Sequence, residues 1–173
     1  SESADRKIRF MTGSRQSGGG GRATMPESEF ISKYLIDGSI SGEDMTSAIK
    51  EISNTNDPLL RQKMFAALLE NLTSENAKSA FLALREGRRG GPFGRGGEDQ
   101  IRLLANAWGR IDGAGAVAAL KEIASEEGEN DRDNGRGRGG RGSGALSGVL
   151  AGWATVDGAA ASAYLGGIED DRE

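Results

Sequence analysis

Two fifteen-residue segments of this chain resemble each other and align without a gap. Residues 106–120 and residues 151–165 lie 45 positions apart. The corresponding pairs are Trp108 and Trp153, Ile111 and Val156, Asp112 and Asp157, Ala116 and Ala161, and Leu120 and Leu165. A fainter copy lies 39 positions upstream of the first, where the same places are held by Leu69, Leu72, Thr73, Ala77 and Phe81. Repetition at this period is typical of stacked units that each bury an apolar face against a neighbour, so the repeat predicts an architecture but no reaction.

The region 26–168 carries the periodicity and the end signals of amphipathic helices. Ser41-Gly42-Glu43-Asp44 has the form of a capping box, and Asp57-Pro58 places an N-cap residue before a proline at the first helical position. The first four helices are expected to begin at Pro26, Ser41, Asp57 and Thr73 or Ser74. Two hairpins follow, 98–111 with 113–127 and 144–156 with 158–168. The sequence therefore predicts eight helices, no strand and an all-α fold.

Asp112 and Asp157 each lie where one predicted helix ends and the next begins. A carboxylate at that position accepts hydrogen bonds from the unpaired N–H groups of the second helix, so both residues are interpreted as N-caps and not as a catalytic acid pair. Trp108 and Trp153 each stand three residues before the repeated Ile or Val. We interpret both indole rings as packing between repeats, with a ligand-stacking platform as the alternative. Replacing either one by Ala is expected to cost roughly 3–5 kcal/mol of stability through cavity formation.

Alanine and glycine dominate the second helix of each predicted hairpin. Residues 114–119 and 159–163 are almost entirely small, which is expected to let these helices approach their neighbours closely. An early Trp with small residues at the helix crossing resembles tetratricopeptide and HEAT-type α-solenoids, although the tetratricopeptide period is about 34 residues and its Leu-Gly pair and closing Pro are missing here. The resemblance implies a right-handed, α-solenoid-like array of antiparallel helical hairpins with long Gly/Arg-rich loops between repeats. It also implies a protein-binding or assembly scaffold.

Two stretches rich in glycine and arginine interrupt the array, at residues 87–97 and 134–144. They occupy corresponding places in consecutive repeats and are similar to RGG-type low-complexity segments, in which arginine contacts phosphate and stacks on exposed bases. The candidate contact residues are Arg88, Arg89, Phe93, Arg95, Arg136, Arg138 and Arg141. Three interpretations stay open: RNA-binding loops, contacts with acidic surfaces of a partner or second copy, and solvated spacers. The acidic run at 126–133 counts against RNA, because it repels phosphate beside the second stretch.

The chain contains neither histidine nor cysteine. This removes the commonest general base, the commonest transition-metal ligand and any thiolate nucleophile. The acidic run at 126–133 lacks the Asp-x-Asp-x-Asp-Gly spacing of a calcium-binding loop. A formal net charge of −4 gives no overall attraction to nucleic acid or to an anionic membrane. The sequence therefore predicts no catalytic residue, no metal ligand and no cofactor, and the chain is not expected to be an enzyme.

The chain is expected to divide into a flexible basic, Gly-rich tail or docking arm (1–25), a helical-repeat domain (26–168) with insertions at 87–97 and 128–144, and an acidic tail (169–173). No apolar run reaches the roughly 18 residues of a membrane span. The first residue is a serine, which slightly favours an exported protein, while the compartment stays open. The predicted function is a non-enzymatic scaffold that binds a protein partner or further copies of itself, with RNA binding as the alternative.

Overall fold

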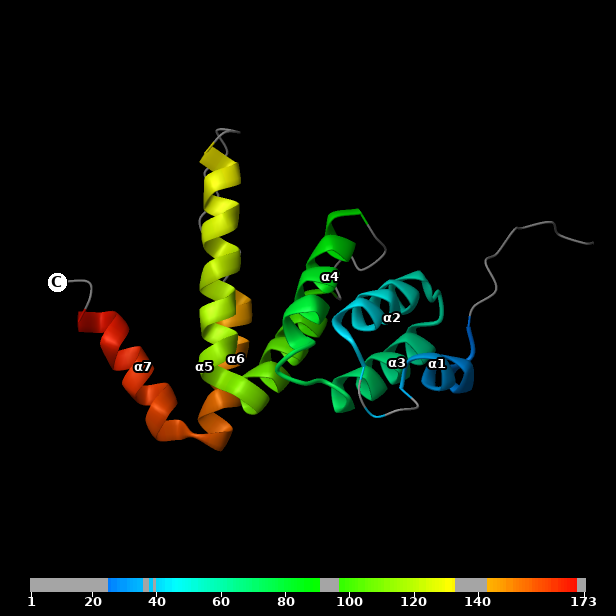
Figure 1. The fold of residues 1–173 in the computed structure, drawn as a ribbon, viewed down its shortest axis with the longest axis horizontal. Coiled ribbons are helices and arrows are strands. Elements are labelled where there is room, and N and C mark those ends of the chain that lie inside the picture. Colours follow the sequence, from blue (N-terminus) through cyan, green and yellow to red (C-terminus); the bar gives the residue numbers. More distant parts are fainter. Residues whose placement is uncertain (1–24, 36–37, 39, 91–96, 133–142, 171–173) are drawn as a thin grey trace, which may run out of the picture.

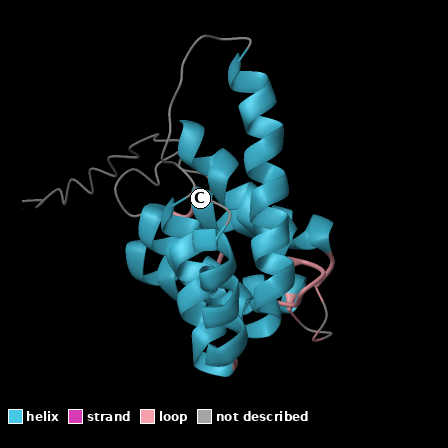
Figure 2. Ribbon diagram, turned by 90° about the vertical axis from the view of Figure 1, so that its left-hand side faces the viewer, coloured by secondary structure: helices cyan, strands magenta, loops and turns pink. Residues whose placement is uncertain are grey.

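The computed structural model of the chain describes residues 25–35, 38, 40–90, 97–132 and 143–170 (Figure 1). Over these ranges the backbone forms seven helices: α1 (Glu27–Tyr34), α2 (Gly42–Asn54), α3 (Pro58–Glu70), α4 (Ala77–Gly90), α5 (Gly97–Arg132), α6 (Ser143–Val156) and α7 (Gly158–Asp170). Figure 2 shows helices and loops, and no strand occurs among the described residues. The predicted all-α fold class is confirmed.

Helix α5 contains two of the helices that the sequence predicted, 98–111 and 113–127. The described ranges therefore hold seven helices where eight were expected. Asp112 has φ −152° and ψ 81°, which is not a helical conformation. The chain changes direction there, as Figure 1 shows. We call residues 97–111 the first segment of α5 and residues 113–132 the second segment.

Helices extend into both glycine- and arginine-rich stretches. α4 continues to Gly90, α5 continues to Arg132, and α6 begins at Ser143. These helix ends take in the first residues of the 87–97 insertion and both edges of the 128–144 insertion. Residues 1–24, 91–96, 133–142 and 171–173 lie outside the described residues, so the predictions about the tails and the centres of the insertions stay predictions.

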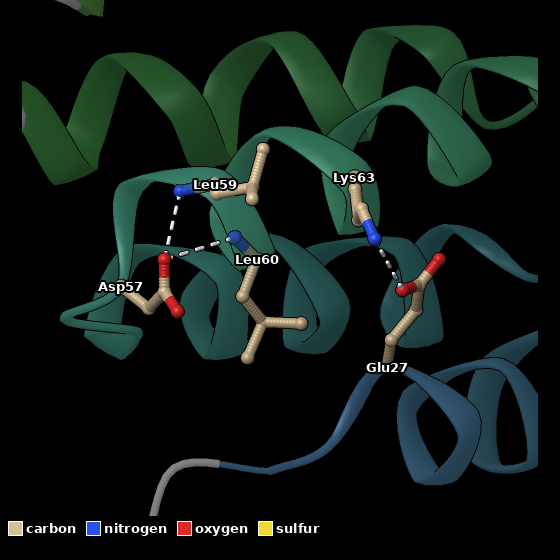
Figure 3. Close-up of polar contacts among 5 residues, drawn as sticks. All are labelled: Glu27, Asp57, Leu59, Leu60 and Lys63. Carbon is tan, nitrogen blue, oxygen red and sulfur yellow. Dashed lines mark hydrogen bonds and ion pairs between the residues drawn. The ribbon is translucent and has the colours of Figure 1, made fainter.

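Side-chain caps define where α2 and α3 begin. The Ser41 hydroxyl oxygen accepts a hydrogen bond from the Asp44 N–H at 3.1 Å, as the capping-box pattern predicts. The Asp57 carboxylate accepts from the N–H groups of Leu59 (2.9 Å) and Leu60 (3.2 Å), as Figure 3 shows. Figure 3 also shows an ion pair between Lys63 of α3 and Glu27 of α1, with 3.7 Å between the charged atoms. Both side chains of that pair are well exposed, so it contributes little to stability.

A continuous apolar core follows the row of helices from α1 to α6. Its fully buried members include Phe30, Met45, Ile49, Ile52, Met64, Leu68, Leu104 and Val149. The main helix contacts join α1 with α2 and α3, α2 with α3 and α4, α4 with α5, α5 with α6, and α6 with α7. Figure 1 shows the result as a row of helices with α1 at one end and α7 at the other. Contacts between helices one or two places apart along the chain therefore build the described part of the molecule.

A buried asparagine ties the start of α2 to the turn between α3 and α4. Asn76 has an exposed fraction of 1%, and its side-chain amide donates to the carbonyl oxygens of Ile40 (3.0 Å) and Asn71 (3.2 Å). Its side-chain oxygen accepts from the Thr73 N–H at 2.8 Å, and the Thr73 hydroxyl accepts from the Asn76 N–H at 3.3 Å. The Thr73 hydroxyl thus accepts a backbone hydrogen bond just before α4 begins, where the sequence predicted a cap at Thr73 or Ser74. Buried polar groups need such partners, because an unpaired one costs free energy.

Replacing Asn76 by Ala should lower the free energy of unfolding by about 2–3 kcal/mol, because the buried carbonyl of Ile40 and the partly buried backbone groups of Asn71 and Thr73 lose their hydrogen-bond partner. Urea unfolding followed by circular dichroism measures the change. The exposed Asn56 provides a matched control, for which Asn56→Ala should stay within about 0.5 kcal/mol of wild type. Equal effects at the two positions would contradict the role given to Asn76.

Candidate functional site at the contact between α5 and α6

The most extensive helix contact in the described structure joins α5 and α6, and small residues make it possible. α6 contains no charged residue, and its Gly148 and Gly152 stand four positions apart, so they share one face. The first segment of α5 carries Ala105 and Gly109 at the same spacing. Glycine without a Cβ atom allows another backbone to approach directly.

The backbones of the two helices meet at these glycines. A Cβ atom on Gly109 would fall on the carbonyl group of Val149, and one on Gly152 would fall on the carbonyl group of Asn106. The Asn106 side-chain amide also donates to the Gly148 carbonyl oxygen at 3.5 Å, which adds a polar link across the contact. Neither Gly109 nor Gly152 has room for a side chain unless the helices separate.

The direct backbone contact between α5 and α6 therefore lies outside the alanine-rich strings, where the sequence predicted close helix packing. The alanine-rich strings at 114–119 and 159–163 were expected to make it. In those strings Ala116 and Ala161 are buried, whereas Ala118 is exposed. Glycines in the first segment of α5 and in α6 make the direct backbone contact instead. The four-residue spacing of small residues in α5 and α6 is the sequence signal that indicates this contact. It is hard to recognise because alanine is abundant elsewhere in the chain.

Trp108 lies in the core, with an exposed fraction of 2%. Its ring centroid is 6.1 Å from that of Phe81 in α4, and the two ring planes are inclined by 49°. This tilted arrangement is favourable for two aromatic rings. Because the indole is enclosed by protein, Trp108 offers no open surface for stacking a ligand, and the geometry supports the core interpretation.

Trp153 lies half-buried where α5, α6 and α7 meet. Its indole covers Gly113, where a Cβ atom would overlap the ring. Its ring centroid is 6.0 Å from that of Tyr164 in α7, at an interplanar angle of 43°. The Lys121 ammonium group of α5 lies 5.0 Å from the Tyr164 ring centroid, within range of a cation–π contact. Trp153 therefore holds the last helix, α7, to the rest of the row.

Asp112 and Asp157 have the same local geometry. Asp112 Oδ1 accepts from the Gly115 N–H at 2.9 Å, and Asp157 Oδ1 accepts from the Ala160 N–H at 2.9 Å. In both cases the donor is three residues further along, as expected of an N-cap. The two carboxylates therefore serve two separate helix starts, that of the second segment of α5 and that of α7.

Replacing Asp112 by Ala should lower the free energy of unfolding by about 1–2 kcal/mol, because the Gly115 N–H loses its acceptor at a partly buried helix start. Asp112→Asn keeps an acceptor oxygen and should cost less. Urea unfolding curves of the two variants at neutral pH give the comparison. An equal loss in both would show that the charge, and not the capping hydrogen bond, stabilises the junction.

The apolar residues three positions after each Trp are exposed. Ile111 is 46% exposed and Val156 is 66% exposed. Leu165 is 48% exposed, although the corresponding Leu120 is partly buried against the core. Ile111 and Val156 stand at or near helix ends, beyond the faces that meet a neighbour. At the end of the row formed by α6 and α7, large apolar side chains are left uncovered.

An ion pair joins α4 to the second segment of α5. Lys78 Nζ lies 2.5 Å from Glu122 Oε2, and this hydrogen bond raises the pKa of Lys78. Both side chains are exposed, so the pair contributes little to stability.

Across the described ranges, no group of three metal-binding side chains comes together.

The structure does not describe how the predicted Gly/Arg contact residues lie relative to one another. Arg88 and Arg89 belong to α4, but their side chains are not among the described ones. The remaining candidates lie outside the described residues: Phe93, Arg95, Arg136, Arg138 and Arg141. Their role stays a prediction from sequence.

The chain matches no known protein family, no curated protein and no solved structure. In the part of the chain that the structure describes, none of the helices combines the length and the apolar character needed to cross a membrane.

Proposed function

We propose that the chain is a non-enzymatic helical-repeat scaffold that binds a protein partner or further copies of itself. In this proposal the helices form a right-handed, solenoid-like array of hairpins. The main helix contacts join helices that are one or two places apart along the chain, which supports such an array. Scaffolds of this kind act through the shape of their helix faces, so they need no reactive group.

The observation that carries the proposal is the register of the α5–α6 contact. A Cβ atom on Gly148 would lie 3.0 Å from the Arg102 carbonyl oxygen and 3.1 Å from the Ala105 Cβ atom. Gly152 meets Asn106. The pairs 102 with 148 and 106 with 152 are each 46 positions apart, close to the 45-residue sequence period. Gly109 meets Val149 and Gly113 meets Trp153, pairs that are each 40 positions apart. Helices at corresponding places in consecutive repeats therefore pack against one another, which is the arrangement expected of stacked units.

The described carboxylates favour a structural role over catalysis. Asp112 and Asp157 accept capping hydrogen bonds. Catalysis by a nucleophile or a general base requires a group held beside an activating partner, and histidine and cysteine, the commonest such groups, do not occur in the sequence. Helix faces are the stronger candidates for function.

If the chain binds further copies of itself, its molar mass in solution should depend on concentration. Light scattering on the purified chain across a concentration series should give a molar mass that rises above 18.1 kDa as concentration increases. The expected reason is that uncovered apolar side chains at the α7 end gain a neighbour. A mass fixed at 18.1 kDa would contradict self-assembly and leave a foreign protein as the partner.

RNA binding stays the alternative, supported by the composition of the stretches at 87–97 and 134–144. It predicts an affinity for single-stranded RNA that falls steeply with salt, because arginine contacts to phosphate release counterions. Binding that is indifferent to salt would exclude it.

A further inference from the structure

Helix α7 lies at one end of the row and packs against it through few side chains (Figure 1). Of the α7 side chains that the structure describes, Ala161 is buried, Ala160 and Tyr164 are partly buried, and the others are exposed. Tyr164 is the one large side chain among these three. Its ring lies beside the Trp153 indole, with the Lys121 ammonium group over it. Docking of α7 therefore depends mainly on one half-exposed aromatic contact.

The equivalent helix one repeat earlier is held much more firmly. The second segment of α5 stands 45 positions before α7, and its Ala116, Val117 and Ile123 are each 4% exposed or less and belong to the continuous apolar core. In α7, Ala161 takes the place of Ala116 but is buried outside that core. The exposed Ser162 takes the place of Val117. Two helices at corresponding places in the repeat thus bury very different amounts of apolar surface.

The α7 sequence gives the helix little stability of its own. Its 13 residues are within the range of about 12–15 below which an isolated helix is marginal in water. Three of them are the glycines Gly158, Gly166 and Gly167, and a Cβ atom on any of the three would meet nothing within 4 Å. Glycine weakens a helix, and no close packing requires it at these positions. The helical state of α7 therefore depends on docking.

Docking of α7 also carries a cost. The Tyr164 hydroxyl oxygen is buried, and it has no hydrogen-bond partner in the part of the chain that the structure describes. A buried hydroxyl without a partner has lost its hydrogen bonds to water, which is unfavourable. Release of α7 returns this group to water.

We propose that α7 is a releasable latch, which undocks from α6 and unfolds as a unit while α1 to α6 stay folded. Local opening of this kind needs less free energy than global unfolding, because only the contacts of one element are lost. Release uncovers the side of the Trp153 indole that Tyr164 contacts. The docked and released forms thus present different surfaces at this end of the row, whatever partner the scaffold binds.

A buried thiol on α7 measures the release, because the full chain contains no cysteine. Ala161→Cys places the thiol on the docked side of α7, and Ala116→Cys places it at the equivalent buried position of α5. A thiol reagent should label the Ala161→Cys variant about tenfold or more faster than the Ala116→Cys variant, whose thiol is reached only when the core opens. Equal helical circular dichroism checks that both variants fold.

Two results of this labelling experiment would overturn the latch. Equally slow labelling of the two variants would show that α7 opens only with the core. Labelling of Ala161→Cys at the rate of the urea-unfolded chain would show that α7 is not docked at all.

Hydrogen exchange on the unmodified chain gives a second measurement that needs no substitution. Backbone amides of residues 158–167 should exchange about tenfold or more faster than those of residues 145–156, yet more slowly than in an unfolded peptide. Exchange of α7 in step with α6 would contradict independent release.

Variants of Tyr164 identify what holds the latch closed. In the Ala161→Cys background, Tyr164→Ala should speed labelling about tenfold, because the main apolar contact of α7 is lost. Leu165→Ala, at an exposed position of the same helix, is the control and should leave the rate unchanged. Tyr164→Phe keeps the ring and removes the unpaired hydroxyl, so it should label no faster than the parent variant. An unchanged rate in Tyr164→Ala would overturn the closing role of this ring.

Discussion

Replacing Gly152 by Ala should destabilise the protein by about 2–3 kcal/mol, although Ala is the better helix former. The added methyl group would fall on the Asn106 carbonyl group, which belongs to the backbone of α5 and cannot rotate away. The two helices must separate, and the contact that joins α5 to α6 loosens along its length. The free energy of unfolding from urea titration is the quantity to measure.

Gly144 in the same helix provides the control. A Cβ atom there meets nothing within 4 Å, so Gly144→Ala should raise the free energy of unfolding by about 0.5–1 kcal/mol through helix propensity alone. The two substitutions are chemically identical and should have opposite signs. A stabilising Gly152→Ala would contradict the backbone contact between α5 and α6.

Replacing Trp108 by Ala should lower the free energy of unfolding by about 3–5 kcal/mol, because a fully enclosed indole leaves a cavity between α4 and α5. Trp153→Ala should cost about 1–2 kcal/mol, since that ring is half-buried and water can replace part of it. The sequence alone predicted equal costs for the two residues, and the structure separates them. Thermal and urea unfolding of both variants would measure the difference, and an equal or larger loss in Trp153→Ala would contradict it.

Most helix positions were predictable, because local signals determine where these helices begin. Ser41 and Asp57 make the capping hydrogen bonds that their sequence context predicts. Asp112 and Asp157 could be placed at helix starts because the repeat shows the same acidic residue twice between helical patterns. Each of these signals acts within four residues, so no tertiary information was needed.

The arrangement of the helices depended on information that the sequence pattern does not carry. Ile111 fits an apolar stripe by spacing, yet it is 46% exposed because no neighbour covers that part of α5. Gly109 and Gly152 read as weak points of a helix, whereas in the structure they are where two backbones meet. Asn76 carries no periodic signal at all, and its burial arises from partners that include Ile40, 36 positions away. In each case a contact distant in sequence decides the role.

The proposed function depends on the stacking of α6 against the first segment of α5, through residue pairs whose separations lie near the sequence period. The most direct test is nuclear magnetic resonance on the full chain, with nuclear Overhauser contacts recorded from the glycine α-protons. We expect contacts from Gly109 to Val149 and from Gly152 to Asn106, since those backbones touch. Their absence, with contacts from these glycines only to residues of their own helices, would contradict the stacked-repeat account.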